Sequence, residues 1–240
     1  MKIKKSSELL WLLGIVFVAL GVAICSKADL GVSMIAAPAF VVFEAIAPIW
    51  SGFSVGMTEY IIQGLMLILL CLIVRRFNWR YLLAFAVAVL YGYTLNLFLR
   101  LLGDFTVSEV WLRWVMLIVG DVITAFGVAC FFRTYLPLTV YELFVAELAA
   151  RFHLNINKTK WGFDISLLAI SITLALTLCG DVSTFDWSTI GYTAFHSIGL
   201  GTLVTTAINS PLIALMGRLL DRVFDATPRF PSVERVLRRN

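Results

Sequence analysis

Charged residues are scarce in this chain, since Asp, Glu, Lys and Arg make up 14% of it while hydrophobic residues make up 60%. A soluble domain carries about 25% charged and roughly 45–50% apolar residues, so this composition cannot cover a core of this size with a polar surface. Residues 9–26, 81–99 and 187–217 contain no Asp, Glu, Lys or Arg. Because a membrane-spanning helix needs about 20 predominantly apolar residues, the sequence predicts an all-α integral membrane protein.

The signatures of metal, redox and nucleotide chemistry are also missing. The four cysteines stand singly in apolar segments, and no pair has C-x-x-C spacing. There is no Gly-Lys-Ser/Thr loop, no His-Glu-x-x-His and no Gly-x-Ser-x-Gly. The net charge is +4, but the basic residues flank the apolar runs and form no face of their own, which argues against nucleic acid as a partner. We expect no enzymatic activity and no cofactor, with membrane lipids as surroundings; a homo-oligomer remains open.

Six apolar runs are long enough to span a membrane: 9–26, 56–74, 81–101, 112–132, 161–180 and 189–217. Two shorter apolar segments, 33–50 and 137–153, are harder to place. If neither crosses, 16 of the 19 basic residues fall on one side together with both termini. If 33–50 crossed, Arg75, Arg76 and Arg80 would move to the other side. The positive-inside rule therefore predicts six spans of a cell membrane, with both termini cytoplasmic.

The two halves of the chain resemble one another. Gly-Val-Ala at 21–23 recurs at 127–129, and at the same offset Lys27 aligns with Arg133. Because each half has three spans, an odd number, the second must insert upside down relative to the first, as in the inverted repeats of many transporters. The predicted parts are a cytoplasmic N-terminus (1–8), a first three-span repeat (9–101), an external loop (102–111), a second three-span repeat (112–217) and a basic cytoplasmic tail (218–240).

Each predicted repeat contains a short re-entrant or interfacial helix after its first span. Glu142, Glu147 and Arg151 make 137–153 partly polar, which fits an amphipathic helix in the membrane interface. Glu44 is the only charge within 33–50, which fits a re-entrant helix shielded by protein better. Both interpretations stay open for both segments.

Asp121 is the most informative single residue, as the only charge between Arg113 and Arg133 and near the centre of the fourth span. A carboxylate at this depth costs roughly 2.5–3.5 kcal/mol on insertion scales. We expect it to face the bundle interior or a water-filled cavity, as a proton or cation relay or as an anchor for a substrate amine. The alternative is a hydrogen-bonded acid that packs between helices.

Basic residues precede both short segments, Lys27 in the first half and Arg133 in the second. The N-terminus of a half-helix offers free N–H groups and partial positive charge, and a neighbouring cation strengthens such an anion site. Ser33 and Thr139 would add hydroxyl donors. The alternative is that both long side chains reach the interface without binding anything.

Four further polar residues lie within predicted spans. Asp164 follows Lys160 by one turn, either as an interfacial ion pair or as the inner part of a polar path. Gln63 occupies the equivalent place in the second span, where a helix–helix hydrogen bond is the simpler use. His196 suits either packing or a proton relay. Asn209 stands two residues before a proline that frees backbone groups.

Five stretches are similar to the YczE/YitT-like group of small bacterial membrane proteins, namely 27–33, 133–138, 141–144, 199–203 and 209–211. Many members continue the first loop with Pro-Trp-Asp, where this chain has Ser33-Met34-Ile35. The resemblance implies a bacterial cytoplasmic membrane and six spans, and it implies no settled activity.

These observations lead to one functional hypothesis and one alternative. The inverted repeat, the acid at mid-depth and the two basic half-helix starts favour a secondary transporter or permease for a small polar or anionic solute. The alternative is an accessory or regulatory membrane protein that binds the spans of a partner and transports nothing.

Overall fold

Six long helices dominate the computed structural model, which describes residues 3–179, 185–186, 191–192 and 198–227. They are α1 (Ser7–Lys27), α3 (Val55–Val74), α4 (Arg80–Leu102), α5 (Val110–Phe131), α7 (Ile156–Cys179) and α8 (Leu200–Val223). All six are long and apolar enough to cross a membrane. The predicted class, a multi-pass helical membrane protein, is therefore confirmed.

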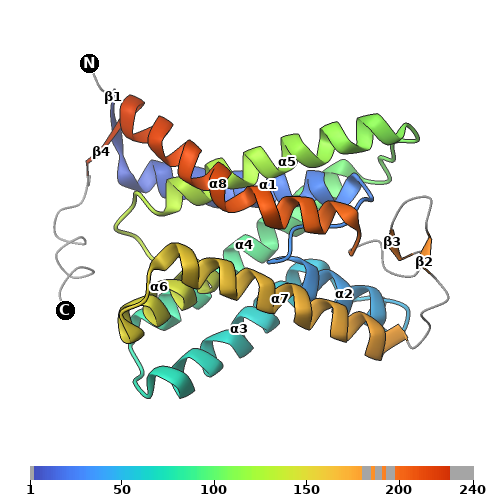
Figure 1. Ribbon diagram of the computed structural model, residues 1–240, viewed down its shortest axis with the longest axis horizontal. Coiled ribbons are helices and arrows are strands. Elements are labelled where there is room, and N and C mark those ends of the chain that lie inside the picture. Colours follow the sequence, from blue (N-terminus) through green and yellow to red (C-terminus); the bar gives the residue numbers. More distant parts are fainter. Residues whose placement is uncertain (1–2, 180–184, 187–190, 193–197, 228–240) are drawn as a thin grey trace.

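Two short helices and four short strands complete the described fold: α2 (Ala37–Ile46), α6 (Val140–Phe152), β1 (Ile3–Ser6), β2 (Phe185–Asp186), β3 (Gly191–Tyr192) and β4 (Phe224–Thr227). β1 pairs in parallel with β4, and β2 pairs antiparallel with β3. β1 directly precedes α1, and β4 directly follows α8. Their pairing therefore brings the start of the first helix next to the end of the last helix (Figure 1).

The sixth span differs from its prediction at both ends. The sequence placed it at 189–217, but α8 begins at Leu200 and continues to Val223. The apolar run that begins at residue 187 has no charged residue, so its hydropathy does not show where the helix begins. The start of the helix depends instead on backbone hydrogen bonds. Gly199 has extended backbone, and the Gly201 N–H donates to the carbonyl of Leu30 at 2.8 Å instead of to its own chain. The helix therefore starts where the chain meets the loop after α1.

Close contact between α1 and α5 forms the centre of one helical group, which α8 joins on the α5 side and α4 on the α1 side (Figure 1). Gly14 faces Gly127 and Gly21 faces Gly120, so the two helices run antiparallel. A Cβ atom built on Gly21 would lie 2.5 Å from the carbonyl oxygen of Gly120. Only glycine permits this approach, as at small-residue helix crossings in membranes.

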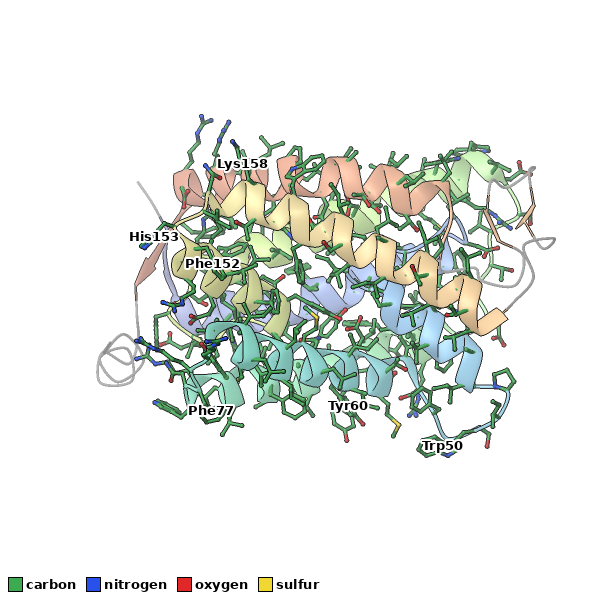
Figure 2. The ribbon with its side chains drawn as sticks, turned by 60° about the horizontal axis from the view of Figure 1, so that its bottom comes forward. Trp50, Tyr60, Phe77, Phe152, His153 and Lys158 are labelled. Atoms are coloured by element: carbon green, nitrogen blue, oxygen red, sulfur yellow. The ribbon has the colours of Figure 1, made fainter. Side chains whose placement is uncertain are left out.

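The loops segregate to the two ends of the bundle. Figure 2 shows Phe77, Phe152, His153 and Lys158 at the end where β1 and β4 also lie, and Trp50 at the opposite end. The segment between α1 and α3, which contains α2, therefore starts and finishes at the Trp50 end. This is the arrangement expected if that segment does not cross.

The outward faces of the spans are apolar and the interior carries polar groups. On α3, Leu65, Ile68 and Leu72 are exposed, whereas Glu59 and Gln63 of the same helix are fully buried. Lipid accepts an apolar exterior, so the composition that excluded a soluble domain is accommodated. The polar interior remains to be explained.

Candidate functional site

Among the described residues, six buried side chains within or between the spans carry a carboxyl or amide group: Glu59, Gln63, Asp121, Glu142, Asp164 and Asn209. Ionisable residues inside a membrane bundle are costly and by default mark a functional site. Their positions relative to one another and to the cavities show which of them can act together.

A small cavity of about 30 Å³ lies where the middles of the spans meet, and we call it the central cavity. Its lining residues are Val18, Val22, Ser33, Ile35, Ala36, Gln63, Tyr91, Thr124, Val128, Thr139, Tyr141, Glu142 and Asn209. Four of the residues predicted from the sequence, Ser33, Thr139, Gln63 and Asn209, thus meet at one place. They come from both halves of the chain.

The central cavity is lined in matched pairs. Ten of its residues fall into five pairs separated by 106 positions, the offset at which the sequence aligns the halves: Val18 with Thr124, Val22 with Val128, Ser33 with Thr139, Ile35 with Tyr141 and Ala36 with Glu142. The same offset relates the glycine contacts, since Gly14 and Gly21 correspond to Gly120 and Gly127. The cavity therefore receives equivalent positions from each half.

A hydrogen-bond network ties α3 to the start of α6 beside the cavity. The Glu59 carboxylate accepts from Gln63 Nε2 at 3.4 Å and from the Tyr141 hydroxyl at 3.1 Å, both at Oε2. The Val140 N–H donates to Gln63 Oε1 at 3.3 Å, which satisfies one of the free amides of the first turn of α6. Gln63 therefore accepts one hydrogen bond between helices, the kind of contact that its sequence context suggested.

Two acceptor oxygens at the central cavity have no hydrogen-bond donor among the described residues: Glu142 Oε2 and Asn209 Oδ1. Glu142 is 7% exposed and Asn209 1% exposed. Helix α6 lies outside the six spans, and burial raises the pKa of the Glu142 carboxyl, although the Lys160 ammonium opposes that shift. Buried polar atoms normally have partners, so these two oxygens point to a bound species.

A second cavity, of about 450 Å³, reaches from the β1–β4 end toward the central cavity, and we call it the vestibule. Its lining residues are Phe132, Arg133, Val145, Ile156, Lys160, Trp161, Ser210, Pro211, Ile213, Ala214, Gly217 and Arg218. On α6 and α8, and just after α5, the two linings come close in the sequence: Val145 follows Glu142, Ser210 follows Asn209, and Phe132 follows Val128. Along these segments the two linings therefore lie within about one helical turn, about 5.4 Å, of each other.

The basic residues before the short helices contact groups away from the N-termini of those helices. Lys27 donates to the backbone carbonyl of Gly103, at the end of α4. Arg133 makes two hydrogen bonds of 2.7 Å to the Asp221 carboxylate, from Nε and from one terminal nitrogen. Ordinary ion-pair and carbonyl contacts compete for these long side chains, and sequence spacing does not reveal those partners. Arg133 contributes instead to the vestibule wall.

Asp121 is fully buried, and neither carboxylate oxygen has a hydrogen-bond partner within the described part of the chain. It lines neither the central cavity nor the vestibule, although Thr124 of the same helix lines the former. Asp164 is also buried and pairs with Lys160 at 3.2 Å. His196 falls outside the described residues.

Three residues of the site were not selected from the sequence: Glu59, Tyr141 and Glu142. Glu59 stands one turn before Gln63 in an apolar helix, which could have marked it as an intramembrane acid. Glu142 was interpreted as the polar face of an interfacial helix, yet it is buried, whereas Arg151 of the same helix is exposed. Which face of a short helix points inward depends on its tertiary packing.

The amino-acid sequence itself matches one known protein family. A family model matches residues 5–218, from just before α1 to within α8. The chain belongs to DUF6198, a family of unknown function. The DUF6198 match does not name the YczE/YitT-like group, so that resemblance stays a prediction. No curated protein and no solved structure matches the chain.

Proposed function

We propose that this DUF6198 protein is a secondary transporter or permease of the bacterial cell membrane for a small polar or anionic solute, with both termini in the cytoplasm. The observation that carries the proposal is the vestibule, whose lining comes within one helical turn of the lining of a polar cavity at the middle of the spans. Small-molecule sites typically have volumes of about 300–1,000 Å³, a range that includes the vestibule. The proposal involves no enzymatic step and no cofactor.

The packing of the helices supports an inverted repeat. α1 packs against α4 as α5 packs against α8, and α2 packs against α7 as α6 packs against α3. Exchanging α1–α4 for α5–α8 therefore maps each of these contacts onto another of them. The antiparallel crossing of α1 and α5 fits a two-fold axis in the membrane plane, because an axis along the membrane normal would make them parallel. Transporters with such repeats bind solute where the halves meet.

The burial of α2 and α6 favours the re-entrant interpretation over the interfacial one. A re-entrant helix has to be shielded by protein or line a cavity. α2 packs against α3 and α7, and α6 packs against α3, α4 and α7. Both helices are buried at their N-terminal ends, Ala37–Val41 in α2 and Val140–Glu142 in α6, whereas an interfacial helix would bury one face in lipid.

The charge of the vestibule supports a polar or anionic solute. Three cations line it, Arg133, Lys160 and Arg218. Arg133 and Lys160 are each paired with an aspartate, and Arg218 has no ion pair within the described ranges. The net positive charge of a concave site attracts anions from solution. Under the positive-inside assignment, this opening faces the cytoplasm.

A steric block of the vestibule tests the proposal. Ala214 lines the vestibule, while Leu215, its neighbour on α8, is exposed on the outer surface and does not. Purified protein in liposomes is assayed for uptake of radiolabelled phosphate, acetate, lactate, glycine and glutamate. We expect uptake of at least one probe, loss of that uptake in Ala214→Trp, and retention in the matched control Leu215→Trp.

Two outcomes would contradict the proposal. One is that no probe enters faster than into protein-free liposomes, which would favour the accessory-protein alternative. The other concerns Ala214, which lines the vestibule and is exposed. In a cysteine-free background, Ala214→Cys should react with a membrane-impermeant maleimide from the cytoplasmic side, and reaction only from outside would reverse the orientation.

A further inference from the structure

We propose that the central cavity binds one monovalent cation of the size of Na⁺, held by the Glu142 carboxylate and the Asn209 amide oxygen, and that this ion accompanies the solute. The coupling to solute rests on the proposed transport function, whereas the binding site does not. The site is distinct from the vestibule, which would hold the solute.

The donor set of the cavity suits a hard cation. Glu142 Oε2 and Asn209 Oδ1 are acceptors without a donor among the described residues, and both line the cavity. Ser33, Thr124 and Thr139 add hydroxyl oxygens to the same wall. Carboxylate, carbonyl and hydroxyl oxygens are the ligands of hard cations in proteins. The two acceptors that lack a donor can be satisfied by a cation or by a donor such as water.

The local charge favours the cation over water alone. Besides Glu142, the ionisable groups of this region are the buried Glu59 and Asp164 and the half-buried Lys160, so three carboxyl groups lie near one ammonium. Lys160 is paired with Asp164, and Glu59 accepts hydrogen bonds from Gln63 and Tyr141. Water cannot neutralise an ionised Glu142, whereas a cation or a proton can, and an uncompensated buried carboxylate is very costly.

The size and charge of the cavity limit the ligand to a single small ion. A cavity needs about 10–15 Å³ to hold one water molecule, so about 30 Å³ accommodates one ion with at most a water or two. An organic solute does not fit. Glu142 is the only carboxylate among the lining residues, which matches one positive charge better than two. Tyr91 and Tyr141, the remaining titratable groups that face Glu142, are neutral phenols.

The ligands are concentrated on the second half of the chain. In three of the five matched pairs the second-half residue is polar where the first-half residue is apolar: Val18 and Thr124, Ile35 and Tyr141, Ala36 and Glu142. The cation site therefore lies mainly on the second half of the chain, and α6 and α8, which carry Glu142 and Asn209, also line the vestibule. Shared helices give a physical route by which ion and solute can influence each other.

Binding of radioactive ²²Na⁺ to the purified full-length protein in detergent, with choline as the replacement cation, tests the site without any solute. We expect saturable binding of one Na⁺ per chain. Glu142→Gln and Asn209→Leu should each weaken binding at least about tenfold, as expected for the loss of one charged or fully buried ligand. Glu147→Gln is the matched control on α6, because Glu147 is absent from the cavity lining, and it should bind like the parent.

Binding should also weaken as the pH falls, because a proton and Na⁺ compete for the Glu142 carboxylate. This pH series uses the parent protein, so it tests the site even if a variant does not fold. Three results would overturn the proposal: no saturable Na⁺ binding by the folded parent, unchanged binding by folded Glu142→Gln and Asn209→Leu, or tighter binding of Ca²⁺ than of Na⁺. Na⁺ binding without solute uptake would refute the transport function alone, and uptake without Na⁺ binding would refute the cation site alone.

Discussion

The glycine crossing of α1 and α5 allows a quantitative test of the packing. A Cβ atom on Gly21 would lie 2.5 Å from the carbonyl oxygen of Gly120, and ordinary van der Waals contact begins at 3.4 Å. Gly21→Ala therefore requires the two backbones to separate by about 0.9 Å, the difference of these distances. Overpacking typically costs about 1–3 kcal/mol, and a backbone-to-backbone clash belongs at the upper end.

Alanine also favours helix over glycine by about 1 kcal/mol, which reduces the loss to about 2 kcal/mol for Gly21→Ala. Gly162 on α7 is the matched control, because a Cβ atom there meets nothing within 4 Å among the described residues. Gly162→Ala should show only the helix gain, a stabilisation of about 1 kcal/mol. The two substitutions are chemically identical, yet their effects should have opposite signs.

Thermal unfolding in detergent micelles measures the difference. We expect Gly21→Ala to lower Tm by about 4–8 °C and Gly162→Ala to raise it by about 2–4 °C. Gly127 corresponds to Gly21 at the repeat offset and touches the backbones of Val18 and Gly14, so Gly127→Ala should resemble Gly21→Ala. Equal stability of Gly21→Ala and the parent would refute the close approach of the two helices.

Three further predictions concern the topology, a buried ion pair and the acid of α5. In a cysteine-free background, Asp104→Cys should react with an impermeant maleimide from outside and Arg76→Cys only from the cytoplasm; the reverse pattern would contradict the orientation. Lys160→Met should lower the free energy of unfolding by about 3–5 kcal/mol in chemical denaturation, because it leaves Asp164 buried without its partner. A loss below about 1 kcal/mol would mean that the pair behaves as if exposed. Asp121→Asn should fold normally yet abolish solute uptake or its dependence on pH between about pH 5 and 8, and uptake like that of the parent would leave Asp121 a packing role only.

The asymmetry of the central cavity links these predictions. Where the repeat offset places Ala36 opposite Glu142, the first half contributes a methyl group and the second a carboxylate. The backbone arrangement of the two halves can therefore be equivalent while the chemistry is carried by one of them. Substitutions in the second half should affect function more than the equivalent substitutions in the first half, which should act mainly through packing.

The membrane class and the spans followed from the sequence alone. A charge-free apolar run long enough to cross the hydrocarbon core is visible in the sequence without knowledge of the tertiary structure. The repeat offset was also visible locally, and it aligns Ser33 with Thr139, both of which line the central cavity. Basic residues predicted the orientation because their distribution depends on loop position and not on packing. Even so, the start of α8 was misplaced, since it depends on the contact of Gly201 with Leu30.

Only the tertiary structure decided which polar side chains meet. Glu142 and Asn209 reach one cavity from α6 and α8, while Asp121, the acid that stood out most in the sequence, lines neither described cavity. Arg133 pairs with Asp221 of a distant helix instead of serving the start of α6. The physical reason is that lipid is as apolar as a protein core, so hydrophobic periodicity does not distinguish the inward face of a membrane helix. That face is chosen by shape, above all by the glycines of α1 and α5, and by the hydrogen bonds that buried polar groups must find.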